Sequence, residues 1–190
     1  MQAIKLEQIG DQVKVTCPYN EEFVRKAHNL RGKWKENAWW FDDSILEYVR
    51  EVMIQIYNTT GEVPYDNCTL VITDFSGDEM MDPVNLFGRT IAEASGRDSG
   101  ARLGEDIIFI KGRYTSGGSV KNWRTVVSNA MFEIQNFPMP SLELPDVKKA
   151  IEEGWCKVKE AKKKRSRDDI QKEIEALSLR ISELEKELNA

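Results

Sequence analysis

The chain has few of the residues from which proteins build disulfide frameworks, metal sites and general-base chemistry. Its 190 residues include three cysteines and a single histidine. Cys17, Cys68 and Cys156 lie far apart with no CxxC pair, and an odd number suits neither a disulfide framework nor a zinc site. His28 lies in an expected helix, where a lone histidine is more often a surface or core residue than a general base. We therefore expect reduced thiols and no metal.

Catalytic motifs are also missing. The sequence has no nucleophile elbow, no HExxH pair, no Walker sequence and no glycine fingerprint for dinucleotides. An acidic cluster between Asp74 and Asp82 lacks the alternating ligand spacing of a calcium loop, which favours a solvated turn. Carboxylates from distant segments can still meet in a fold, so sequence alone leaves acid-base pairs open. We expect a protein that is not an enzyme, with no cofactor and no catalytic residue.

Long apolar runs are absent as well. No stretch of about 18 apolar residues could span a bilayer, and the N-terminus has neither the basic nor the apolar region of a secretion signal. These absences predict a cytoplasmic protein. The formal net charge is −5, so the overall charge of the chain does not favour nucleic-acid binding. Any cationic binding site must therefore be local.

What is present divides into three predicted parts, the first being residues 1–64. Alternating apolar residues on both sides of Gly10 predict two strands, and Asn20 is a credible N-cap for a helix ending at Gly32. A second hairpin turns at 36–37, and a capping box of Ser44 and Glu47 opens a second helix. The prediction is a ββαββα unit with both helices on one face of an antiparallel sheet.

Residues 65–138 form the second predicted part, an antiparallel β-rich unit. Turn signals at 76–78, 96–98 and 116–118 separate its strands. The expected strands are 68–75, 84–95, 105–115, 120–128 and 130–137. The whole chain is therefore expected to belong to the α+β class.

Residues 139–190 are predicted to form a linker and a helical tail. Three prolines mark the linker, and a helix begins near Pro145. The later part of this helix, 157–167, has seven Lys and Arg against one Glu, which is typical of a solvated face but could meet an acidic partner. Apolar residues then repeat at coiled-coil spacing, which predicts a homo-oligomer, with a helix packed on the body as the alternative: Ile170, Ile174, Leu177, Ile181, Leu184 and Leu188.

The stretch from Gly96 to Trp123 is the richest in glycines and cationic side chains that could bind an anion. Two glycine-rich loops bracket the apolar run Ile107–Ile110, which reads as a buried strand closed by Gly112. Glycine allows backbone N–H groups to approach an anion, and four cations could supply charged donors: Arg97, Arg102, Arg113 and Lys121. The alternative is that these residues have structural roles only. Arg97 and Asp98 would then form an ion pair, the paired glycines would form a hairpin turn, and Trp123 would be a core aromatic.

Two resemblances follow from these motifs. Pro18-Tyr19-Asn20, Arg31-Gly32-Lys33-Trp34 and Trp39-Trp40-Phe41, followed by a helix, resemble the small HARP-like modules that accompany DNA annealing helicases and some mobile-element proteins. Trp34, Trp39 and Phe41 then either stack on bases or, as the favoured interpretation, form the core of a small sheet.

The second resemblance covers about residues 10–137. It rests on four motifs: Gly88-Arg89, Gly96-Arg97-Asp98, Gly112-Arg113-Tyr114 and the run from Gly117 to Asn122. Together these motifs resemble the first-described family of phage Thoeris anti-defence proteins, which are sponges that sequester cyclic ADP-ribose signals. The resemblance implies capture without turnover, between protomers, in the cytoplasm of an infected bacterium, with cyclic oligonucleotides as possible further ligands in some members. The residues assigned to ligand binding are Arg97, Asp98, Arg113, Tyr114, Gly117, Gly118, Ser119, Lys121, Asn122 and Trp123.

The chemistry of these residues suits a nucleotide. Arg97 and Arg113 can grip a diphosphate, Lys121 adds a point charge, Asn122 can read ribose or base edges, and Tyr114 or Trp123 can stack. The leading hypothesis is thus a sponge for a cyclic nucleotide signal. The alternative is a nucleic-acid-binding module that uses the tryptophan-rich N-terminal sheet and the basic run 157–167.

Overall fold

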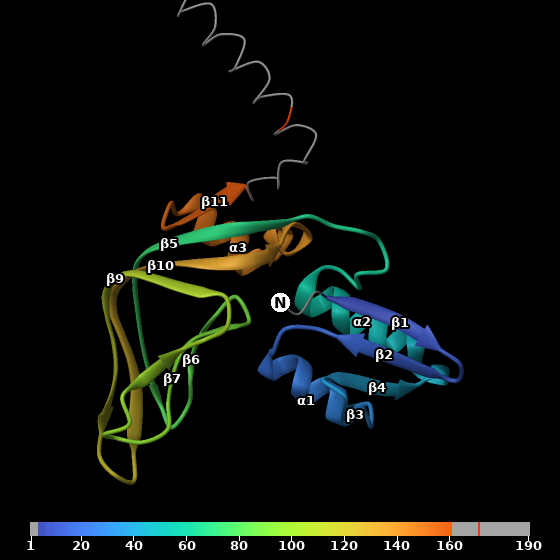
Figure 1. Cartoon of the computed structure of the whole chain (residues 1–190), viewed down its shortest axis with the longest axis horizontal. Helices are drawn as coiled ribbons and strands as arrows, with labels where there is room; N and C mark the ends of the chain where they lie inside the picture. The colour runs from blue at the N-terminus through green and yellow to red at the C-terminus, as the bar shows by residue number, and fades with distance from the viewer. Residues whose placement is uncertain (1–3, 161–170, 172–190) are drawn as a thin grey trace, which may run out of the picture. The chain divides into compact units, whose positions relative to one another are not determined.

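The computed structural model describes residues 4–160 and Gln171 (Figure 1). Most of the elements within them are strands, which form three antiparallel sheets. Three α-helices accompany the sheets in this part of the chain. The expectation of a mixed α and β fold with antiparallel pairing is confirmed. The basic residues of 161–167 and the heptad residues of 170–188 lie outside the described residues.

The first sheet has the strand order β1-β2-β4-β3. Its strands are β1 (Lys5–Ile9), β2 (Gln12–Thr16), β3 (Lys33–Lys35) and β4 (Ala38–Asp42). Alternation places Val13 and Val15 in the core. Glu36 and Asn37 both have positive φ, 55° and 56°, which suits the two-residue turn between β3 and β4.

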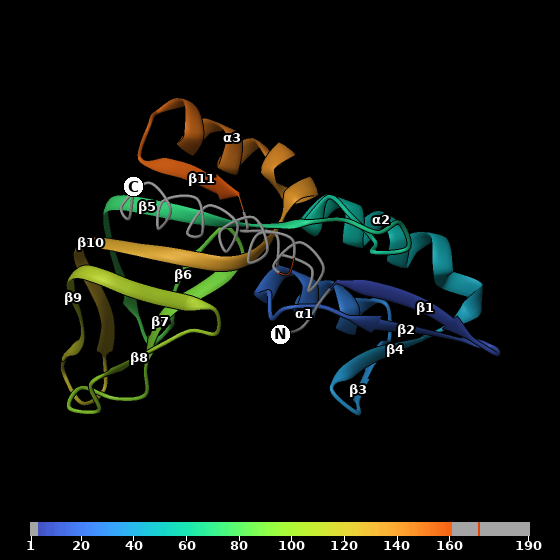
Figure 2. The same ribbon diagram turned by 45° about the horizontal axis from the view of Figure 1, so that its top comes forward.

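Two helices, α1 (Glu21–Asn29) and α2 (Leu46–Tyr57), pack on one face of this sheet (Figures 1 and 2). Asn20 caps α1, because its Oδ1 accepts a hydrogen bond of 2.9 Å from the N–H of Phe23. The side chains that join the helices to the sheet form one apolar cluster: Leu6, Val13, Val15, Phe23, Ala27, Trp39, Phe41, Val49, Met53 and Tyr57.

The start of α2 differs from the prediction. A 3₁₀ turn, η1 (Asp43–Ile45), precedes α2, and the N–H of Ser44 donates to Asp42 Oδ1 at 3.0 Å. Glu47 pairs with Arg50 at 2.5 Å. The predicted capping box of Ser44 and Glu47 is therefore wrong: Asp42 caps η1, and Ile45, at the N-cap of α2, makes no side-chain cap hydrogen bond.

The second sheet has the order β11-β5-β10-β9. Its strands are β5 (Asn67–Met80), β9 (Ile107–Gly118), β10 (Trp123–Pro138) and β11 (Cys156–Glu160). The expected turn at 76–78 lies inside β5, where Gly77 lies so close to Val84 that a Cβ would be 2.6 Å from its Cγ1. The two strands expected over 120–137 are one strand, β10, whose register shifts at bulges.

A third sheet has the order β6-β7-β8. Its strands are β6 (Val84–Leu86), β7 (Arg89–Ala94) and β8 (Ala101–Leu103). The single strand expected over 84–95 is thus a hairpin, which turns at Phe87 and Gly88, both with positive φ. The second and third sheets share a core in which Ile91 packs with Ile72 and Phe132.

The run Ile107–Ile110 was expected to be a buried strand closed by Gly112. It is a strand, the start of β9, but it is only partly buried and does not end at Gly112. Ile107 is buried, but Ile108 is 45% exposed and Ile110 is 51% exposed. The reason is that β9 lies at the edge of its sheet and covers the core with alternate residues only. The strand also continues through Gly112, at φ 101°, to Gly118.

After β10 come a 3₁₀ segment, η2 (Met139–Glu143), and α3 (Pro145–Glu152). The predicted start of a helix near Pro145 is confirmed. The predicted continuation through 157–160 is wrong, because Gly154 has φ 85° and the chain then returns as β11 beside β5. Cys156 is buried in this strand, and Lys159 forms an ion pair of 3.1 Å with Glu133.

Two glycines of the central stretch allow a matched test of packing. A Cβ on Gly104 would lie 1.8 Å from the carbonyl oxygen of Thr90, whereas a Cβ on Gly96 would meet no atom within 4 Å. We expect Gly104→Ala to lower the free energy of unfolding by at least about 1–3 kcal/mol and Gly96→Ala to change it by less than about 0.5 kcal/mol. Urea titration measures both. Equal stabilities would contradict the packing described here.

Candidate functional site

Arg97 and Asp98 follow β7 in an exposed turn and pair with each other. Arg97 Nη2 lies 2.7 Å from Asp98 Oδ2, and Arg97 Nε donates to both carboxylate oxygens at 2.9 and 3.1 Å. These contacts hold the pKa of Asp98 below its ordinary value. The guanidinium expected to grip a diphosphate is thus engaged by its own neighbour, as the structural alternative predicts.

The turn that carries Arg97 is fastened to β9. Ser116 Oγ donates to the carbonyl oxygen of Arg97 at 2.7 Å and accepts from the N–H of Gly100 at 3.0 Å. The structure therefore brings the Arg97–Asp98 turn beside the end of β9 that leads into Gly117 and Gly118. A neighbouring pocket of about 220 Å³ is lined by Glu93, Ala94, Ser95, Ser99, Gly100 and Arg102.

The side chain of Arg113 lies on the opposite face of β9 from the Arg97–Asp98 turn. The pairing of β9 with β10 is regular from Arg113 to Gly118, so side chains alternate between the two faces there. Arg113 and Ser116 are three residues apart and therefore point to opposite faces. Tyr114 shares the face of Ser116, where its ring packs edge-on against Phe109 at 4.8 Å.

The run from Gly117 to Trp123 closes the hairpin between β9 and β10. The N–H of Ser119 donates to Asn122 O, and the N–H of Asn122 donates to Ser119 Oγ, each at 3.1 Å. Gly118 has φ 79°, and a Cβ there would lie 2.3 Å from Asn122 O, so the turn needs glycine. Lys121 is exposed, and Trp123 is half-buried opposite Gly118. None of these predicted site residues lines the pocket beside Gly100 or either of the two pockets described below.

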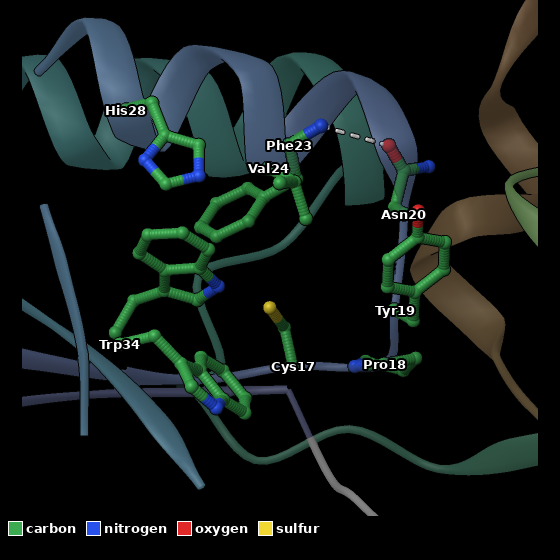
Figure 3. Close-up of a pocket in the computed structure, with 9 residues that line it drawn as sticks. Cys17, Pro18, Tyr19, Asn20, Phe23, Val24, His28 and Trp34 are labelled. Carbon is green, nitrogen blue, oxygen red and sulfur yellow. Dashed lines mark hydrogen bonds between the residues drawn. The ribbon is translucent and has the colours of Figure 1, made fainter.

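A different part of the chain forms a larger pocket, which we call the aromatic pocket. It has a volume of about 460 Å³ and opens between α1, β3, β4 and the segment after β2 (Figure 3). Its lining is Cys17, Pro18, Tyr19, Asn20, Phe23, Val24, His28, Trp34 and Trp39. None of these nine residues is Lys, Arg, Asp or Glu.

Local structure explains how these side chains meet. Phe23, Val24 and His28 share one face of α1, which places them above the sheet. Trp34 and Trp39 are paired across β3 and β4, with ring centroids 5.5 Å apart, and the His28 ring lies edge-on to Trp39 at 5.1 Å. The floor is therefore a set of contacting rings (Figure 3).

The floor and the rim of the aromatic pocket differ in exposure. Trp39 is 5% exposed and belongs to the core, whereas Trp34 is 52% exposed and Tyr19 is 59% exposed. The favoured interpretation of the sequence, core aromatics, thus fits Trp39 but not Trp34. The signal that could have located the pocket was the motif Pro18-Tyr19-Asn20 together with Gly32-x-Trp34.

A smaller polar pocket of about 220 Å³ adjoins the aromatic pocket through two shared residues, Tyr19 and Asn20. Its other lining residues are Glu21, Glu22, Asn85 and Gly88. Glu22 forms an ion pair of 3.3 Å with Lys26. The two pockets together offer flat apolar surface at one end and carboxylate and amide oxygens at the other.

The one thiol that lines the aromatic pocket is not activated. Burial raises the pKa of the Cys17 thiol to about 11, so this sulfur is protonated at neutral pH and is a poor nucleophile. Beneath it the hydroxyl of Tyr57 donates to Pro18 O at 2.9 Å. An aromatic cavity of this size, with no Lys, Arg, Asp or Glu in its lining, suits a flat heteroaromatic ring.

Three further features of the chain concern the site. Among residues 4–160 and Gln171, no three His, Cys, Asp or Glu side chains group so that they could hold a metal ion. None of the described helices is long and apolar enough to cross a membrane. Comparison of the chain with known protein families, curated proteins and solved structures finds no match.

The buried thiol of Cys17 generates a pH prediction. In the unfolded chain it regains its ordinary pKa of 9.0, whereas in the fold its pKa is about 11. Between these values the unfolded state loses the proton first, so stability is complete below pH 9 and falls as the pH rises to 11. The two pKa units correspond to about 2–3 kcal/mol.

Urea titrations of the wild type and of Cys17→Ala from pH 8 to pH 11 measure this effect. The variant should have lower stability at pH 8 but should lose less of it on going to pH 11. Parallel profiles would show that the environment of Cys17 is not as described.

Proposed function

We propose that this protein captures a nucleotide-class ligand through its base and does not convert it. The observation that carries the proposal is the aromatic pocket, whose exposed Trp34 and buried Trp39 offer indole surface to a flat ring. Stacking on an aromatic side chain contributes about 1–3 kcal/mol per base. The protonated thiol of Cys17 agrees with binding rather than nucleophilic chemistry.

The polar pocket supports the same ligand class. Carboxylate and amide oxygens accept hydrogen bonds from sugar hydroxyls, and the carboxylates of Glu21 and Glu22 repel phosphates. A base in the aromatic pocket would thus place its ribose toward Glu21 and Asn85, while its phosphates face solvent. This arrangement differs from the one that the glycine-rich loops suggested, in which the phosphates were gripped by Arg97 and Arg113.

The resemblance to Thoeris anti-defence sponges narrows the proposal to a cyclic ADP-ribose isomer or a related cyclic nucleotide. The biological role would then be removal of an immune signal in the cytoplasm of an infected bacterium. A sponge needs tight binding, and nanomolar affinity corresponds to about −12 kcal/mol. Self-association through residues 170–188 belongs to the same proposal, because each added protomer adds one pocket to the assembly.

Mass spectrometry tests the function directly. The full chain is incubated with cyclic ADP-ribose isomers and cyclic oligonucleotides, separated from free ligand and heat-denatured. We expect release of one intact nucleotide. Release of a cleaved product would indicate an enzyme and contradict the proposal. If the protein retains no nucleotide at all, the proposed capture is also excluded.

Substitutions locate the site. Trp34→Ala should weaken binding of the retained nucleotide at least about fivefold, because a stacking surface is lost, whereas Trp34→Phe should keep most of the affinity. Arg97→Gln serves as the control and should have little effect. Calorimetric titration with that nucleotide measures all three. Loss of binding in Arg97→Gln together with normal binding in Trp34→Ala would contradict the aromatic pocket as the site. It would indicate that the ligand binds at the glycine-rich loops.

A further inference from the structure

The first sheet has a second face that no described element covers. Both helices and the apolar cluster lie on the face that carries Trp39, and Trp40, the next residue of β4, points to the opposite face. The side chains of Lys14, Lys33 and Lys35 are half-buried or exposed, as is Trp40. We call the surface formed by these four residues the lysine face.

Strand register gathers the lysine face around one indole ring. Lys14 on β2 and Lys33 on β3 are the two cross-strand partners of Trp40. The ammonium of Lys14 lies 5.7 Å from the centroid of the Trp40 ring, and that of Lys35 lies 6.0 Å from it. Both distances are typical of cation–π contacts.

The indole of Trp40 is held in place by the backbone. Its Nε1 donates a hydrogen bond of 3.1 Å to the carbonyl oxygen of Lys35. A ring that is already oriented loses less conformational freedom when a ligand stacks on it. Trp40 is therefore a preorganised platform rather than a loose surface side chain.

The local charge is positive around the ring, although the whole chain is acidic. Lys5 pairs with Glu7 and Lys35 with Glu36, at 2.6 and 3.1 Å. Within the described residues Lys14 and Lys33 form no ion pair. Three carboxylates adjoin this face: Glu7 on β1, which is the cross-strand partner of Lys14, Glu36 in the turn and Asp42 at the end of β4.

We propose that the lysine face binds single-stranded nucleic acid. One base stacks on Trp40, and the ammonium groups of Lys14, Lys33 and Lys35 contact the flanking phosphates. A single strand is the partner that fits, because it presents base faces and phosphates together, whereas a duplex hides its base faces in the stack. An acidic peptide would use the lysines but would leave the fixed indole without a partner.

This surface is distinct from the aromatic pocket, although adjacent residues of β4 serve both. The two proposals are therefore separable by substitution. Trp34→Ala should leave oligonucleotide binding unchanged, and Trp40→Ala should leave nucleotide capture unchanged. Each variant is the control for the other.

Fluorescence anisotropy with a fluorescein-labelled oligothymidylate of 15 nucleotides and the full chain tests the proposal. Trp40→Ala should weaken binding at least about fivefold, the lower limit for loss of one stacked base, while Trp40→Phe should keep most of the affinity. The double substitution Lys14→Gln, Lys33→Gln should reduce the slope of log affinity against log salt by about 1.4, or about 0.7 for each phosphate contact. Lys148→Gln, Lys149→Gln on α3 removes the same charge elsewhere and should leave the slope unchanged.

Three outcomes would overturn the proposal. One is unchanged affinity in both Trp40→Ala and the Lys14, Lys33 double variant. Another is equal affinity for a duplex of the same length, and the third is full competition by polyglutamate, which would indicate an acidic protein partner. Should Trp40→Ala fail to fold, the Lys14→Gln, Lys33→Gln variant keeps the test decisive, because it removes charge and no core volume.

Discussion

The N-terminal part of the chain depends on the register of β4, in which two successive tryptophans point to opposite faces. Trp39 is in the core and forms the floor of the aromatic pocket, and Trp40 carries the lysine face. A shift of one residue would exchange the faces of every side chain on the strand. The pairing of β4 with β2 and β3 therefore fixes both surfaces at once. The turn at Glu36 and Asn37 helps to set that register, because its length determines which residues of β3 and β4 meet.

The aromatic pocket combines a fixed floor with an adaptable rim. Phe23 and Trp39 are buried among the residues that hold the helices on the sheet, so their positions are set by folding itself. Tyr19 and Trp34 pack on one side only, and their exposed sides leave room for rotation. Such a division allows a flat ring to enter without disturbing the core. It also explains why Trp34, rather than Trp39, is the residue to replace in a binding experiment.

The sequence predicted those features that depend on local pattern. Alternation at Val13 and Val15, the Asn20 cap and the start of α3 at Pro145 are all set by neighbouring residues. The separation of Arg97 from Arg113 could not be read from spacing, because it depends on the pairing of β9 with β10 and on the bulge opposite Gly112. Nor could β11, since a lysine-rich segment becomes a strand here by pairing with β5, about ninety residues earlier. The aromatic pocket was missed because spacing does not show that α1 leaves Trp34 uncovered.

The edge position of β9 also concerns the behaviour of the protein in concentrated solution. An edge strand offers free backbone groups to any other strand, and the exposed side chains of Ile108 and Ile110 make this one attractive to a second copy. Lys111 and Arg113 follow directly along the same strand and are exposed. Charged side chains on an edge oppose the approach of an identical strand. We therefore expect Arg113 to oppose self-association at this edge, a role that needs no ligand.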